Sequence, residues 1–145
     1  MTSSSAPPHG SALLALQRAT HVTLQILAAE LVDLDLTASE INALAILADG
    51  HGRTITELGS AAGTRPTTLT SVLDRLERRG HITRGTRPGD RRVVVVELSR
   101  SGRLAAATIR RALVEIETRA LDGLPAETVT SFHAVLRALS EVSHA

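Results

Sequence analysis

Apolar residues recur every three or four positions along most of the chain, and this spacing predicts helices. Residues 12–34 carry leucines at this spacing over about six turns, which favours one long apolar helix. Thr37-x-x-Glu40 and Thr54-x-x-Glu57 have the pattern of a capping box, in which each end residue satisfies a backbone N–H of the other. Each box predicts the start of a further helix, the second of them short and ending at Gly63.

A fourth helix follows that glycine. Thr64 is expected to be its N-cap, and Pro66 suits its first turn because proline lacks the N–H that a first turn leaves unbonded. Its apolar residues occupy positions i, i+3, i+4 and i+7, which predicts one buried face; they are Leu69, Val72, Leu73 and Leu76. Gly80 is expected to end this helix.

A β-hairpin is predicted next, from strands at residues 81–86 and 92–98. The segment between them, Arg87-Pro88-Gly89-Asp90, has proline second and glycine third, which is typical of a type II turn. Ser99 is expected to cap a helix over about residues 100–121, Gly123 to end it, and Pro125 to open a last helix. The predicted fold is mainly α with one small β-hairpin.

The charge distribution changes this picture more than the composition does. All 16 basic side chains are arginines and the formal net charge is +1. Residues 51–103 nevertheless carry eleven arginines and five acids, net +6, between segments of net −4 and −1. A basic middle between acidic flanks indicates that one segment faces a polyanion, although charge alone leaves open an ordinary solvated arginine-rich surface.

The exposed face predicted for the fourth helix indicates which polyanion. It combines hydroxyls that allow close approach with arginines suited to guanine edges and phosphates. We therefore expect this helix to read the major groove of duplex DNA, with Asp74 and Glu77 paired to a neighbouring arginine. The predicted recognition residues are Arg65, Thr67, Thr68, Thr70, Ser71, Arg75 and Arg78.

The hairpin gives a second signal, because arginines gather around its tight turn. Such concentrated positive charge is unfavourable without an anion, and the DNA backbone would supply one. We expect Asp90 to pair with Arg92 and to orient its guanidinium. A charged hairpin in solvent is the alternative interpretation. The predicted wing residues are Arg84, Arg87, Asp90, Arg91 and Arg92.

Two motifs in this segment resemble the MarR (multiple antibiotic resistance regulator) family. They are Asp90-x-Arg92-x-x-x-Val96-x-Leu98-Ser99-x-x-Gly102 and Leu73-x-x-Leu76-Glu77-x-x-Gly80-x-Ile82-x-Arg84. The resemblance implies a winged helix-turn-helix fold in an intertwined homodimer and a transcriptional regulator, usually a repressor, that binds a pseudo-palindromic operator. It also implies release from DNA by a small ligand, as in many relatives.

These expectations give a domain plan. A disordered tail occupies residues 1–11, dimerisation helices 12–36 and 123–143, the winged helix-turn-helix 37–100, and a connecting helix 101–122. The apolar stripes of the first and last helices exceed what one small domain buries, so we expect them to pair across a two-fold axis. The predicted dimerisation residues are Leu13, Leu16, Leu24, Leu27, Phe132, Val135, Leu136 and Leu139.

An effector pocket would have unusual walls, since Phe132 is the single aromatic residue. Arg18 and His21 are the candidate polar contacts on the first helix, with a rim salt bridge and a surface histidine as the alternatives. Cysteine is absent, which excludes thiol redox sensing. No pair of the six histidines has metal-ligand spacing, so no metal or cofactor is predicted.

Other function classes fit less well. There is no phosphate-binding glycine loop and no nucleophile elbow, so we expect no enzyme. Binding of RNA or single strands needs aromatic stacking residues that the chain lacks. A helical protein-interaction module would leave the Thr, Ser and Arg face unexplained. Since residues 2–11 lack signal-peptide features and no apolar run approaches ~20 residues, we expect a cytoplasmic, nucleoid-associated protein.

Overall fold

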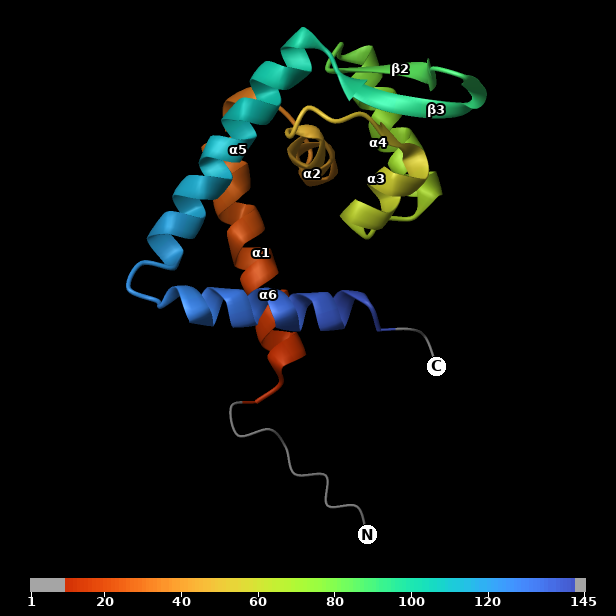
Figure 1. Cartoon of the computed structure of the whole chain (residues 1–145). Helices are drawn as coiled ribbons and strands as arrows, with labels where there is room; N and C mark the ends of the chain where they lie inside the picture. Colours follow the sequence, from red (N-terminus) through yellow and green to blue (C-terminus); the bar gives the residue numbers. More distant parts are fainter. Residues whose placement is uncertain (1–9, 143–145) are drawn as a thin grey trace. The chain divides into compact units, whose positions relative to one another are not determined.

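The structure is a computed structural model that describes residues 10–142 (Figure 1). The chain divides into two compact units between Val114 and Glu115. Residues 1–9 of the predicted tail, with His9, lie outside the described residues, as does His144. Among the described residues, no helix combines the length and apolar character needed to cross a membrane.

The first unit begins with α1 (Ala12–Glu30), whose N-cap Ser11 accepts a hydrogen bond from the N–H of Leu14 at 3.3 Å. The long helix predicted over 12–34 ends early. A short 3-10 helix, η1 (Val32–Leu34), follows, and Asp35 then adopts the left-handed conformation with φ 50°. Aspartate tolerates this conformation better than most residues, and it turns the chain toward the next helix.

The second helix, α2 (Ala38–Leu47), confirms the first capping box. The Thr37 hydroxyl accepts from the N–H of Glu40 at 3.2 Å, and the Glu40 carboxylate accepts from the N–H of Thr37 at 3.1 Å. Leu44 and Leu47 are almost completely buried and form the centre of the first unit's core.

The helix-turn-helix consists of α3 (Ile55–Ala62) and α4 (Pro66–Arg78). Thr54 caps α3 through the N–H of Glu57, and Gly63 ends it with φ 63°. The prediction that Thr64 caps α4 is wrong, because the N-cap is Arg65. Proline disfavours the α-region for the residue before it, so the helix can begin no earlier than Pro66 and the residue next to it becomes the cap.

The predicted hairpin is present, with β2 (Ile82–Arg87) antiparallel to β3 (Asp90–Leu98). Arg87 pairs with Asp90 across the turn, and Gly89 has φ 87°, the positive value that a type II turn requires at its third position. A third strand, β1 (Arg53–Thr54), was not predicted; it pairs with β3 and gives the order β1-β3-β2. Two residues are too few to show strand periodicity in the sequence.

The hairpin leads directly into α5 (Arg100–Ala120), as Figure 1 shows. Ser99 lies before this helix and accepts from the N–H of Gly102 at 3.1 Å, as expected of a cap. A Cβ on Gly102 would lie 1.8 Å from the carbonyl oxygen of His81, so the helix start packs directly against the backbone at the start of the wing. In the first unit α5 buries Ala105, Ala106, Ile109 and Ala112.

The second unit contains the end of α5 and the last helix, α6 (Ala126–Ser140). Gly123 has φ 80° in the connecting turn, and Pro125 is the N-cap, both as predicted. Unlike α4, α6 has no fully buried residue in the described part of the chain. Its apolar stripe is half-exposed: Phe132 is 49% exposed and Val135 50%.

Candidate nucleic-acid interface

Helix α4, the predicted recognition helix, presents a polar face opposite its buried stripe. Leu69, Val72, Leu73 and Leu76 are at most 2% exposed, which fixes the orientation of the helix on the core. Six of the seven predicted recognition residues are exposed on the remaining face: Arg65, Thr67, Thr68, Thr70, Ser71 and Arg78. The seventh, Arg75, is half-buried at the border of this face.

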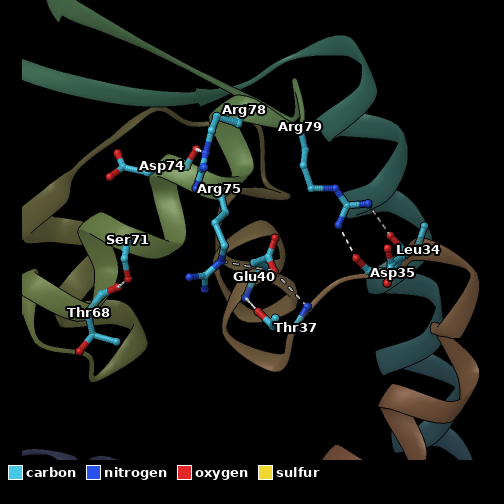
Figure 2. Close-up of polar contacts among 10 residues, drawn as sticks. All are labelled: Leu34, Asp35, Thr37, Glu40, Thr68, Ser71, Asp74, Arg75, Arg78 and Arg79. Atoms are coloured by element: carbon cyan, nitrogen blue, oxygen red, sulfur yellow. Dashed lines mark hydrogen bonds and ion pairs between the residues drawn. The ribbon is translucent and has the colours of Figure 1, made fainter.

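Two of the hydroxyls on this face bond to their own helix. Thr70 donates to the carbonyl oxygen of Pro66 at 2.8 Å, and Ser71 donates to that of Thr68 at 2.9 Å, the latter drawn in Figure 2. Because the hydroxyl proton is used in this bond, the oxygen lone pairs that face outward are acceptors. Such a surface suits the amino groups of adenine or cytosine, and the threonine methyl suits that of thymine.

Both acidic residues of α4 are paired with one arginine of the wing. A terminal nitrogen of Arg84 lies 2.5 Å from Asp74 Oδ1, and its Nε lies 3.3 Å from Glu77 Oε2. The expectation that these acids pair with a neighbouring arginine is confirmed. The one positive charge of Arg84 offsets part of their two negative charges, which reduces the repulsion that they would exert on phosphates.

The position of Arg84 therefore differs from the expected one, which was a contact with DNA. Its side chain is 23% exposed and lies between the wing and α4, where it connects the two. The sequence did not show this because Arg84 and Asp74 belong to different elements. Only the packing of β2 beside α4 brings them together.

The tip of the wing keeps its other arginines at the surface. Arg87 is half-exposed and lies 3.6 Å from Glu57 of α3, while Arg91 and Arg92 are exposed. The predicted pairing of Asp90 with the Arg92 guanidinium is wrong: Asp90 Oδ1 instead accepts from the backbone N–H of Arg92 at 3.0 Å. An aspartate two residues before an N–H forms this local turn readily.

A hollow of about 400 Å³ lies beside the recognition helix, lined by Glu40, Arg75, Arg78 and Arg79. Arg79 donates to the carbonyl oxygens of Leu34, at 3.1 Å, and of Asp35, so it attaches the end of α4 to the segment between α1 and α2 (Figure 2). The sequence predicts neither this role of Arg79 nor the position of Glu40 beside Arg75. Glu40 was assigned through its capping box alone.

The predicted effector contacts lie elsewhere. Arg18 and His21 are both exposed on α1, and His21 Nε2 lies 3.3 Å from Gln25 Nε2. Neither lines the hollow. The described residues contain no group of three or more His, Asp or Glu side chains arranged to hold a metal ion.

One histidine does occupy a structural junction. His81 begins the wing, and its Nδ1 lies 2.6 Å from Ser101 Oγ at the start of α5. Burial, with the nearby positive charge of Arg79 as a second cause, lowers the pKa of His81 below its ordinary value. The neutral imidazole is therefore the favoured form at this junction.

The polar helix face, its paired acids and the arginine wing lie in one sequence segment. Residues 36–94 match the MarR family. The matched segment covers α2, α3, α4, β2 and most of β3, so the resemblance to the MarR family is confirmed where the candidate interface lies.

Solved structures extend the likeness to most of the chain. A MarR-family transcriptional regulator from Silicibacter pomeroyi is 25% identical with a TM-score of 0.79, covering 94% of this chain and 93% of that one. NadR, solved with 4-hydroxyphenylacetate, is 21% identical with a TM-score of 0.83, covering 96% and 99%. CouR from Rhodococcus jostii RHA1, solved with p-coumaroyl-CoA, is 22% identical with a TM-score of 0.80, covering 90% and 92%.

The fold is therefore the winged helix fold of MarR-family proteins, mainly α with a small antiparallel sheet, as predicted. No curated protein sequence matches the chain.

Proposed function

We propose that the protein is a transcriptional regulator that binds a specific, pseudo-palindromic duplex operator as a homodimer and represses transcription. The observation that carries the proposal is the exposed face of α4, where hydroxyls and arginines remain while both acids are paired with Arg84. A helix with such a face fits the major groove, and an arginine hairpin beside it fits the adjacent backbone. No catalytic role enters this proposal.

The dimer part of the proposal rests on exposed apolar surface. Leu13 and Leu24 of α1 are 51% and 43% exposed, close to the values for Phe132 and Val135 of α6. Isolated apolar residues on a surface are ordinary, but stripes of them mark sites of association. Pairing with a second copy would cover both stripes and place two recognition helices about 34–36 Å apart, one turn of DNA.

The effector part rests on the relatives. NadR was solved with 4-hydroxyphenylacetate and CouR with p-coumaroyl-CoA, both aromatic acids or derivatives of them. We propose that a small molecule of this class releases the protein from its operator. Regulation of this kind takes place on the chromosome, which places the protein in the cytoplasm at the nucleoid.

A mobility-shift titration with the DNA that flanks its own gene tests the proposal. Arg75→Ala should weaken operator binding by about 1–3 kcal/mol and relax base preference, because Arg75 is the proposed base reader. Arg92→Ala should weaken binding to all duplexes and lower the slope of log K against log salt by about one, the value for one lost phosphate contact.

The matched control is Arg110→Ala, which removes one exposed arginine from α5, outside α4 and the wing. Its DNA affinity should equal that of the wild type. If Arg75→Ala and Arg92→Ala also bind like the wild type, the assignment of helix and wing to DNA is wrong. A protein that binds no duplex at all would instead favour a protein-interaction module. Adding aromatic acids to the wild-type complex tests the effector separately.

A further inference from the structure

Glu40 is a buried carboxylate with an unused oxygen. The residue is 3% exposed, and its Oε1 accepts from the N–H of Thr37 in the capping box. Its Oε2 is buried and has no hydrogen-bond partner among the described residues. A buried charge is retained at a cost unless another charge compensates it, so Glu40 needs a cationic neighbour.

Arg75 supplies that charge with one edge of its guanidinium. Its Nε lies 3.9 Å from Glu40 Oε1, within ion-pair range but too far for a hydrogen bond. The same Nε is buried and has no hydrogen-bond partner in the part of the chain described. Figure 2 shows this nitrogen turned toward Glu40, while the two terminal nitrogens lie on the opposite side of the guanidinium.

The other arginines around the hollow have different partners. Arg79 donates to the carbonyl oxygens of Leu34 and Asp35, and Arg78 Nε lies 3.4 Å from the carbonyl oxygen of Asp74. Of the described residues that line the hollow, Glu40 is the single acid beside three arginines. Arg75 is the one of the three that forms an ion pair with it.

We propose that Glu40 is a positioning residue for Arg75, which it orients so that the two terminal nitrogens can bind one guanine. This inference rests on the proposed function. Bidentate recognition of guanine O6 and N7 requires the guanidinium plane in a fixed orientation. An arginine whose Nε edge is held by a buried carboxylate loses less side-chain freedom when DNA arrives, which favours the specific complex.

Glu40→Gln tests the role of the charge without removing the capping bond that stabilises the fold. Glutamine is also accepted at this position of a capping box, so the bond to the N–H of Thr37 is kept while the charge is lost. Glu117→Gln, an exposed position on α5, gives the same change in net charge and serves as the control. Circular dichroism should show the wild-type helix content for both variants.

The experiment is selection from random duplexes, with sequencing of the bound fraction to obtain base preferences at each operator position. Arg75→Ala should remove the preference for guanine at one position in each half-site, since a bidentate pair is worth about 5- to 150-fold in discrimination. Glu40→Gln should weaken that same preference by at least about threefold and leave the other positions unchanged. Glu40→Gln added to Arg75→Ala should change nothing further, and Glu117→Gln should match the wild type.

Three results would overturn the positioning role while leaving the proposed function intact. In the first, Glu40→Gln keeps the wild-type guanine preference that Arg75→Ala loses. In the second, Glu40→Gln weakens the base preference equally at all positions. In the third, Arg75→Ala alters the base preference at no position. If the wild-type protein enriches no sequence, the proposed function fails and this inference fails with it.

Discussion

The helices α4 and α6 carry the same apolar spacing but bury it to different extents. In α4, Leu73 and Leu76 are 0% exposed, since the rest of the first unit covers that stripe. In α6, Phe132 and Val135 remain 49% and 50% exposed. The difference teaches that spacing reveals which face of a helix is apolar but does not reveal what covers it.

Helix α1 contains both situations. Leu27 is 7% exposed and Leu31, just beyond the helix, is 4% exposed, so the C-terminal part belongs to the core of its own unit. Leu13 and Leu24 are exposed like the residues of α6. We therefore assign Leu27, which was predicted as a dimerisation residue, to the core of the single chain. The association surface that we propose uses the exposed and half-buried apolar residues of α1 and α6.

Leu139→Glu should have the largest effect, because it places a charge on the apolar stripe of α6 that we propose a second chain covers. Burying an unpaired carboxylate costs several kcal/mol, so the dimer dissociation constant should rise at least about 100-fold. Sedimentation equilibrium measures this change. Thr130→Glu, which adds the same charge at an exposed position of α6 away from the stripe, should leave the dimer intact. A dimer that persists in the Leu139 variant would refute the proposed association surface.

Leu73→Ala should have the next largest effect, because Leu73 is completely buried in its own chain. Truncating a buried leucine costs about 2–5 kcal/mol of unfolding free energy. Urea titration in the Leu139→Glu background measures this loss without a contribution from dimerisation. Val135→Ala in that same background should cost less than about 1 kcal/mol, since Val135 is half-exposed in the single chain. Equal losses for the two variants would contradict the distinction between the helices.

The smallest effect concerns the junction of the wing with α5. Because burial lowers the pKa of His81 in the folded protein, the unfolded chain binds this proton more tightly. The stabilisation is complete above the unfolded pKa of about 6.5 and is lost as pH falls through the folded pKa. In urea titrations from pH 7.5 to 5, the free energy of unfolding should fall more steeply for the wild type than for His81→Gln. Identical pH profiles would show that His81 is not a source of the pH dependence.

The winged helix was predictable because its signals are local. The capping box at Thr37, the proline at Pro66 and the turn glycine Gly89 each act on residues within one turn of themselves, and the structure has all three in place. Leu69 to Leu76 likewise form a complete stripe. The error at Thr64 arose where the effect of proline on its preceding residue outweighed a capping preference.

The contacts of the candidate interface were less predictable, since they join distant parts of the chain. Arg84 meets Asp74 ten residues away, and Arg79 meets Asp35 forty-four residues away. Each contact joins two different elements, and the spacing of residues within one helix or strand does not indicate such contacts. Glu40 shows a related difficulty, because the capping box accounts for this residue in the sequence and its neighbour Arg75 lies thirty-five residues away.

We propose that two copies of one DNA-reading surface bind specific duplex DNA, and the selection from random duplexes tests this proposal most directly. We predict that the wild-type protein enriches a site with two half-sites related by a two-fold axis, with centres about 10–10.5 base pairs apart or a multiple of that distance. A single asymmetric site would contradict the dimeric mode of binding. No enrichment of any sequence would contradict the claim of specific recognition itself.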